Sequence, residues 1–135
     1  MPYTYTIESE QRLIRVRMWG SVTPAEIEAV RQSVAADPRF KTDLSELVDL
    51  RELTLSTAIT TTDIERIASS NIDRVARRAF VAPDPATYGL IRMYDTLRTL
   101  DHAEEQNGIF RNMEDAEAWL GLAPSTSIVG GSQCS

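Results

Sequence analysis

The sequence has almost none of the side chains on which thiol chemistry, histidine chemistry and most transition-metal sites depend. Its 135 residues include one cysteine, Cys134, and one histidine, His102. A single cysteine excludes an internal disulfide, which fits a reducing compartment. One histidine cannot supply the converging ligands of a typical zinc site, and any triad catalysis would have to run through it. We therefore expect a non-enzymatic protein with no metal and no cofactor, in which His102 is a surface residue.

Long apolar runs and an excess of positive charge are also missing. No segment approaches the ~20 apolar residues that a membrane span needs, and the first ten residues lack the pattern of a signal sequence. The chain has 14 Lys and Arg against 20 Asp and Glu, a formal net charge of −6 at pH 7. This balance disfavours nucleic acid or an anionic membrane as the main partner. Arg74, Arg77 and Arg78 are interpreted as exposed charges, and the expected location is the cytoplasm.

What the chain does contain is a regular succession of strand and helix patterns. Residues 3–8 and 12–20 alternate in polarity, and the short segment between them predicts an antiparallel hairpin. Further strands are predicted at 46–50, 77–82 and 109–111, and helices at 23–38, from 62, from 84 and at 113–120. Strands that alternate with helices favour a largely parallel sheet with right-handed crossovers. We therefore predict one α/β domain over residues 1–120 and a disordered tail over 121–135.

Capping residues mark the predicted helix starts. Thr23 with Glu26, and Thr62 with Glu65, have the spacing of capping boxes, in which a hydroxyl and a carboxylate each accept a hydrogen bond from a backbone N–H group. Asn112 is the predicted cap of the last helix, because its side-chain oxygen can accept from the first helical turn. These residues indicate where three of the helices begin.

Two glycine positions carry structural predictions of their own. Gly89 lies inside the third predicted helix, where glycine costs about 1 kcal/mol relative to alanine, so another group is expected to approach closely there. Gly108 follows Asn107, and this pair predicts a turn before the last strand.

A hydroxyl-rich loop follows the third predicted strand and leads into a helix. Its members are Thr54, Ser56, Thr57, Thr60, Thr61 and Thr62. Backbone N–H groups at a helix N-terminus attract anions, and ligands of open α/β sheets bind beyond the carboxyl ends of the strands. The loop has no glycine, however, so it cannot wrap a phosphate as a P-loop does, and hydroxyls also cap helices without any ligand. Ligand contact through Ser56 or Thr57 and plain helix capping both stay open.

Two further groups are candidate ligand or partner contacts. Asp49 and Arg51 flank the end of a buried strand, where they could hold a polar ligand or form a local salt bridge. The candidates for the lining of an apolar pocket are Tyr88, Tyr94, Met93 and Trp19. The same aromatic and sulfur-containing side chains also suit ordinary core packing, so this alternative stays open as well.

Several segments together resemble the SpoIIAA-like family of small bacterial proteins, which is related to STAS and SEC14-like domains. The resemblance covers about residues 3–120. The segments that carry it are RLIRVRMWGSVTPAEIEAV, DPRF, LVDLRELTLS, RRAFVA before YGLIRMY, and IFRNMEDAEAWL. It implies a mixed sheet of four to five strands with an N-terminal antiparallel hairpin and flanking helices. No single motif is diagnostic, but the order and spacing of the segments are shared.

The resemblance implies two kinds of function. Anti-sigma-factor antagonists carry a phosphorylatable serine in an Asp-Ser-Ser setting, which falls near Ser56, Thr57 and Ala58 in this sequence. Thr57 stands at the aspartate position and Ala58 at the acceptor, so Ser56 or Thr57 could serve only after a change of register. The SEC14-like comparison implies an apolar ligand between helices and sheet, and it transfers no particular residue.

The sequence therefore predicts a non-enzymatic regulatory or interaction module that binds a protein partner or a small ligand. A carrier of a partly apolar small molecule or lipid is the alternative, and a phosphorylation switch is the third possibility. A homodimer is a possible partner state, since an exposed apolar patch on such a module would also serve self-association. An enclosed pocket near Tyr88, Tyr94 and the 54–62 loop would favour the carrier.

Overall fold

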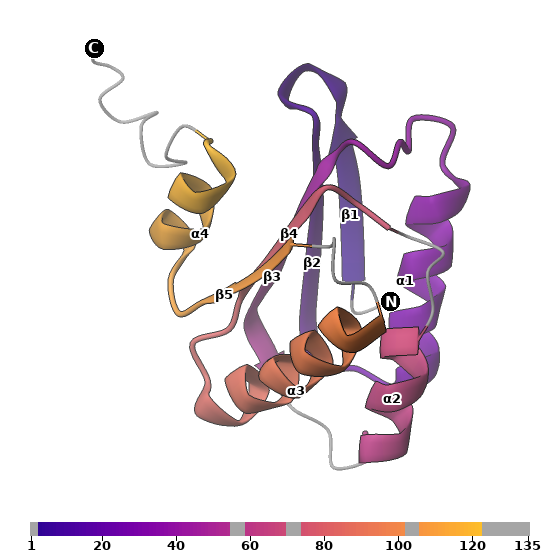
Figure 1. Ribbon diagram of the computed structural model, residues 1–135, viewed down its shortest axis with the longest axis vertical. Coiled ribbons are helices and arrows are strands. Elements are labelled where there is room, and N and C mark those ends of the chain that lie inside the picture. Colours follow the sequence, from indigo (N-terminus) through magenta and orange to yellow (C-terminus); the bar gives the residue numbers. More distant parts are fainter. Residues whose placement is uncertain (1–2, 55–58, 70–73, 102–105, 123–135) are drawn as a thin grey trace.

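The strands form one five-stranded mixed sheet in the order β1-β2-β3-β4-β5 (Figure 1). The computed structural model describes residues 3–54, 59–69, 74–101 and 106–122. The elements are β1 Tyr3–Glu8, the 3₁₀ helix η1 Ser9–Gln11, β2 Leu13–Ser21, α1 Pro24–Ala36, β3 Ser45–Thr54, α2 Thr61–Ser69, β4 Arg77–Val81, α3 Pro85–Asp101, β5 Gln106–Phe110 and α4 Met113–Leu120. β1 and β2 are antiparallel, and every later pair is parallel. The predicted α/β fold and N-terminal hairpin are confirmed.

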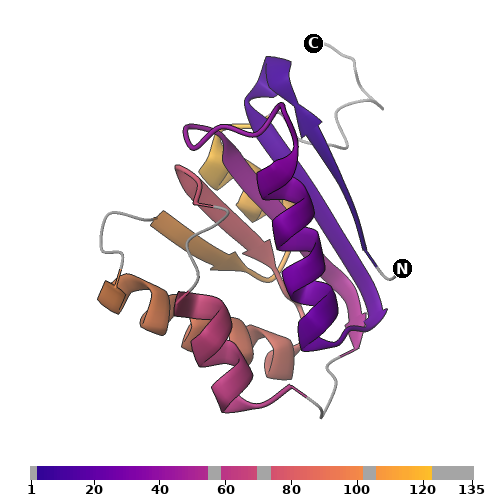
Figure 2. The same ribbon diagram turned by 90° about the vertical axis from the view of Figure 1, so that its right-hand side faces the viewer.

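The order of the strands determines which face each helix covers. Three successive crossovers, β2-α1-β3, β3-α2-β4 and β4-α3-β5, each move one strand further in the same direction. Because such crossovers are right-handed, all three helices lie on one face of the sheet. The helix α4 follows the last strand and covers the opposite face (Figure 2). We call the two surfaces the three-helix face and the α4 face.

Side-chain alternation along the strands divides the core in the same way. On β3, Val48 and Leu50 face α1, α2 and α3, whereas Leu47 faces α4. The smaller α4-face cluster consists of Leu13, Leu47, Ala79, Val81 and Ala116. Strands that are covered on both faces are apolar at successive positions, as in the prediction of a buried strand around residues 46–50. β3 extends this strand in both directions, to ten residues.

The helix caps agree with the sequence in two places and differ in one. Thr23 and Glu26 form the predicted capping box of α1, and Asn112 caps α4 by accepting from the backbone N–H of Asp115. The box at the start of α2 consists of Thr60 and Asp63, with the Asp63 N–H donating to Thr60 Oγ1 at 3.1 Å and the Thr60 N–H donating to Asp63 Oδ2 at 2.9 Å. The predicted Thr62–Glu65 box is therefore wrong, because two boxes of the same spacing overlap in the sequence and the earlier one forms.

The two glycine predictions are also wrong. Gly89 is exposed on α3, and no atom lies within 4 Å of the position that a Cβ would take. Gly108 lies inside β5 rather than in a turn, because the strand begins at Gln106. A Cβ at Gly108 would come within 2.7 Å of the Phe110 ring, which itself packs on Trp119 with the ring centroids 5.6 Å apart. The close approach that the sequence predicted at Gly89 occurs at Gly108 instead.

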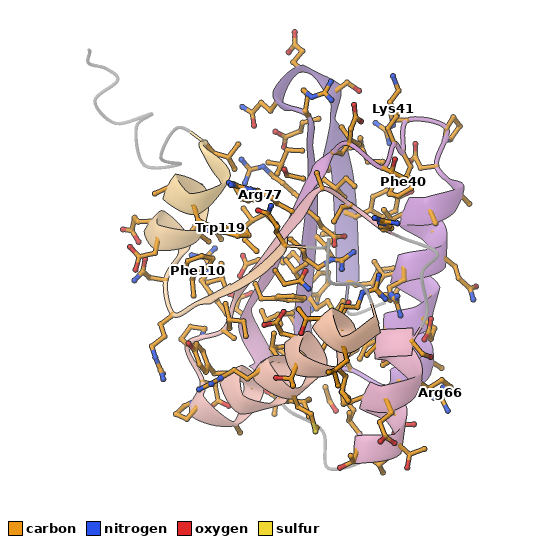
Figure 3. All side chains as sticks on the ribbon, in the orientation of Figure 1. Phe40, Lys41, Arg66, Arg77, Phe110 and Trp119 are labelled. Atoms are coloured by element: carbon orange, nitrogen blue, oxygen red, sulfur yellow. The ribbon has the colours of Figure 1, made fainter. Side chains whose placement is uncertain are left out.

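Arg77 holds the end of α4 against the sheet. Its guanidinium lies 4.9 Å from the centroid of the Trp119 ring, and its Nη1 donates to the Trp119 carbonyl at 2.7 Å (Figure 3). Gly121 then ends α4 in the left-handed region, with φ at 78°. The predicted tail lies outside the described residues from position 123 onward.

Candidate functional site

A cavity of about 110 Å³ lies between the three-helix face of the sheet and the helices α1, α2 and α3. Its wall is mostly aliphatic and aromatic, and its members on the sheet and the helices include Val16, Val48, Phe80, Val30, Ile64 and Ile67. The strand residues reach it because they share one side of the pleat, and the helix residues because they lie on the apolar stripe of each helix. A hollow of this kind can take an apolar group.

A buried polar cluster forms one part of the cavity wall. Arg78 is 2% exposed and Glu46 is 4% exposed, and Arg78 Nε donates to Glu46 Oε1. Arg78 Nη1 also donates to the Tyr94 hydroxyl at 3.2 Å. The Tyr94 ring packs edge-on against Phe80, with the centroids 5.7 Å apart. The charges of Glu46 and Arg78 thus offset each other inside an apolar surround, as buried charges must.

The sequence analysis missed this cluster. It interpreted Arg78 as an exposed charge, and that prediction is wrong. Two patterns could have revealed the pair: Glu46 alternates with Val48 and Leu50 on β3, and Arg78 alternates with Phe80 on β4. Neighbouring parallel strands then place Glu46 directly opposite Arg78.

Two other buried arginines fix the position of α2. Arg31 of α1 donates through Nη1 to the carbonyl of Ile67, and Arg98 of α3 donates through Nη1 to the carbonyl of Ala68, both at 2.9 Å. These carbonyls belong to the last turn of α2, where the helix leaves its C=O groups without intrahelical partners and carries a partial negative charge. Arg31 also lines the cavity, so the same side chain contacts both the cavity and α2.

Asp49 and Arg51 lie on the other side of the sheet, in a groove of about 230 Å³ beside α4. Arg51 donates through Nη2 to Asp49 Oδ2 at 2.9 Å, so the two residues form the local ion pair that the sequence left as one alternative. Partial burial raises the pKa of Asp49, but hydrogen bonds from the side chain and backbone of Arg51 outweigh it and leave that pKa below its ordinary value. Arg15 and Arg17 line the same groove, and each is paired with a glutamate. The arginines that line the groove are therefore each paired with a carboxylate.

The structure separates the predicted contact residues. Tyr94 lines the cavity, whereas Asp49 and Arg51 face the groove on the opposite side of the sheet. Tyr88 is not among the cavity-lining residues, and the guanidinium of Arg111 lies 4.3 Å from the centroid of its ring. A ligand role for Tyr88 stays a prediction, as it does for Asp49 and Arg51.

Other predicted candidates lie outside the cavity lining or outside the described residues. Met93 packs at the edge of the three-helix core. The centroid of the Trp19 ring lies 4.8 Å from the Arg17 guanidinium. Neither residue is part of the cavity lining. Ser56, Thr57 and His102 lie outside the described residues. From the hydroxyl-rich region, the flanking residues Leu53 and Ile59 contribute apolar side chains to the cavity.

Neither a metal-binding cluster nor a membrane-spanning helix is present in the described residues. In the described ranges, no three His, Cys, Asp or Glu side chains gather closely enough to hold a metal ion. None of the helices in those ranges combines the length and the apolarity that crossing a bilayer requires.

The topology and the helix arrangement together define a SpoIIAA-like α/β fold. Among solved structures, a similar one is an uncharacterised protein of the DUF3478 family with a SpoIIAA-like fold from Shewanella loihica PV-4. The two chains superpose with a TM-score of 0.58 at 19% sequence identity, over 87% of this chain and 93% of the other. No protein-family model matches the chain, and no curated protein sequence matches it. The likeness confirms the fold that the sequence resemblance implied.

Proposed function

We propose that this protein is a non-enzymatic binding module that takes up a small, predominantly apolar ligand between the sheet and helices α1, α2 and α3. The observation that carries the proposal is the cavity of about 110 Å³ with its mainly aliphatic and aromatic wall. Well-packed interiors contain few voids larger than a water molecule, so a hollow of this size needs an explanation. Ligand pockets in proteins have this kind of lining, with a few polar groups that set orientation.

The size and lining of the cavity limit what the ligand can be. An engineered apolar cavity of roughly 150 Å³ in another protein binds benzene, so this one suits a single ring or a short branched chain. Glu46 and Arg78 already neutralise each other, and a charged ligand group would have to break that pair. The expected ligand is therefore uncharged. The SEC14-like resemblance, which implies an apolar ligand in this same place, supports the proposal.

The test uses benzene, toluene and indole as probes in a thermal melt of the wild-type protein. A ligand that binds only the folded state stabilises it in proportion to RT ln(1 + [L]/Kd), so at least one probe should raise Tm in a saturable manner. The filled variant combines Val30→Leu with Val48→Leu, one from each wall of the cavity. It should lose most of the shift.

The matched control is Val81→Leu, which adds the same group to a fully buried β4 residue that faces α4. It should keep the probe-induced shift, even if its own Tm is lower. Equal shifts in the filled variant and the wild type, or no shift with any probe, would contradict the proposal. Native mass spectrometry of the freshly purified protein adds an independent measurement, because a retained ligand appears as a mass that denaturation removes.

A further inference from the structure

The outer edge of β1 presents unpaired backbone. β1 is the first strand of the sheet, and within the described residues it pairs only with β2. Arg39 Nη1 donates to the Ile7 carbonyl at 3.5 Å, so that carbonyl faces away from β2. Because backbone groups alternate in direction along an antiparallel strand, the N–H and C=O groups of Tyr3 and Tyr5 also face outward.

This edge lacks the features with which proteins usually protect a terminal strand. Residues 3–8 contain no proline, no lysine and no bulge, and the only charged residue is Glu8 at the end of the strand. An exposed edge of this kind is a template for another strand. The arginine contact protects the Ile7 end, so the free part of the edge is centred on Thr4.

One flank of α1 lies beside the same edge. The Tyr5 hydroxyl donates to the Ser33 carbonyl at 3.3 Å and to the Asp37 carboxylate at 2.9 Å, so this side of α1 is next to β1. The opposite flank carries Arg31, which reaches α2. The flank beside β1 is a stripe of small residues at helical spacing, namely Ala25, Ala29, Ser33 and Ala36, all of them exposed or half-buried.

We propose that two copies of this chain associate across a twofold axis, with the β1 strands pairing antiparallel and the α1 helices packing through their small-residue flanks. The Tyr3 backbone then bonds with the partner's Tyr5, and Thr4 faces the partner's Thr4 on the axis. The two sheets become one continuous ten-stranded sheet, five strands from each copy. Both cavities lie on the same face of it.

A second copy fits this surface better than an unrelated peptide strand. A peptide would satisfy the backbone of β1 but would leave the small-residue stripe of α1 uncovered. In a twofold pairing each copy supplies both parts, so the surface is self-complementary, as isologous interfaces are. Small residues permit the close approach of two helices that lie over adjacent strands, and the contact is centred on Ala29 and Ser33 at the level of Tyr5.

Cysteine cross-linking tests the pairing and its register. In a Cys134→Ser background, Thr4→Cys places two thiols directly opposite each other at a pair with Cα atoms ~4.5 Å apart, within the range of a disulfide. We expect rapid conversion to a reducible covalent dimer under mild oxidation. The control Thr6→Cys lies on the same strand and face, but its two copies would be too far apart to cross-link. Equal cross-linking of both variants, or of neither, would overturn the proposed register.

Solution mass tests the interface in the unmodified chain. Analytical ultracentrifugation should give a species of twice the 15.1 kDa chain mass as the concentration rises. Ala29→Arg places an unpaired charge in the contact and should weaken association at least ~10-fold. Ala86→Arg makes the same substitution at an exposed position of α3, away from β1 and α1, and should not. A monomer at all concentrations, or equal effects of the two arginines, would refute the dimer.

Discussion

Arg78 carries a positive charge and is 2% exposed. Its contacts with Glu46 and the Tyr94 hydroxyl offset the cost of burying that charge. We predict that Arg78→Met lowers the free energy of unfolding by about 3–5 kcal/mol, because the buried charge of Glu46 loses its ion pair with Arg78. The double variant Arg78→Met/Glu46→Leu should recover most of this loss, since apolar residues of similar volume can replace a buried ion pair. Urea denaturation measures both changes.

The control for this experiment is Arg66→Met. Arg66 extends from the outer surface of α2 (Figure 3), and its side chain is 59% exposed in an ion pair with Asp63. Such pairs contribute roughly 0–1 kcal/mol. If the double variant is as unstable as Arg78→Met alone, the loss comes from packing or from the Tyr94 contact and not from the buried charge of Glu46.

A second residue-scale prediction concerns pH. Asp37 accepts hydrogen bonds from the side chain and backbone of Arg39 and from the Tyr5 hydroxyl, and these hold its pKa well below the ordinary value. A carboxyl group whose pKa is lower when folded stabilises the protein above its unfolded pKa of about 3.9, and that stabilisation is lost as the pH falls. Asp37→Asn should therefore destabilise the protein at pH 7.

The pH dependence shows whether the stability lost in Asp37→Asn comes from the missing charge or from altered hydrogen-bond geometry. Urea midpoints of the wild type and Asp37→Asn should differ clearly at pH 7 and pH 5. The gap should begin to narrow below the unfolded pKa of about 3.9 and should close fully only at a pH below the lowered folded pKa. A gap that does not narrow at all as the pH falls from 5 to 2 would assign the effect to lost hydrogen-bond geometry alone.

These residues show where sequence reasoning succeeds and where it stops. Tyr94 was predicted from aromatic character, and the structure places it at the cavity. Arg78 was missed because it was grouped with Arg74 and Arg77 as solvated charge at a helix end, although its alternation with Phe80 put it on the inner side of β4, opposite Glu46. The groups that bind a charge inside a fold come from other elements, so a single segment does not reveal them.

At the scale of an element, α2 depends on two arginines that belong to its neighbours. We predict that Arg98→Met increases amide hydrogen exchange in residues 61–69 by about tenfold or more, because the Ala68 carbonyl loses a charge-assisted hydrogen bond worth roughly 1.5–3 kcal/mol. Hydrogen–deuterium exchange with mass spectrometry measures this effect. Arg66→Met serves as the control on the same helix. A uniform rise over the whole chain would mean general destabilisation and not release of α2.

The two glycines give paired predictions of opposite sign for α3 and β5. Gly89→Ala should stabilise the protein by up to about 1 kcal/mol, because the site is an exposed helix interior and a Cβ meets nothing within 4 Å. Gly108→Ala should destabilise it, because a Cβ would press on the Phe110 ring and displace it from Trp119. Thermal melts of both variants test the assignment, and the same sign for both would contradict it.

Element positions were predictable from capping chemistry and periodicity to within a few residues, with identifiable exceptions. The Thr60–Asp63 and Thr62–Glu65 pairs compete for one helix start, and the first pair forms in a helix whose Ile64 and Ile67 pack in the core. Asn107-Gly108 has the composition of a turn, yet pairing with β4 draws it into a strand. In both places, contacts with distant elements override the local preference.

At the scale of the whole molecule, the two helical layers share one sheet. The sequence predicted a mainly parallel sheet with an antiparallel edge, which the structure confirms. It could not say which helices cover which face, because that follows from the strand order, and strand order is set by pairing between distant segments. The sequential order β1 to β5 is what leaves α4 alone on its face.

Because both layers pack on the same strands, a loss on the α4 face should weaken the entire fold. We predict that Trp119→Ala lowers the free energy of unfolding by about 2–4 kcal/mol through lost contact with Phe110, Gly108 and Arg77. The chain has two tryptophans, so Trp19 on β2 remains as a fluorescent reporter that does not belong to α4. In Trp119→Ala, the urea transition followed by Trp19 fluorescence should coincide with the transition followed by far-UV circular dichroism. The m-value should equal that of the wild type. An early loss of helical signal while Trp19 fluorescence stays native would show instead that α4 detaches on its own, and the three-helix layer would then be the cooperative unit.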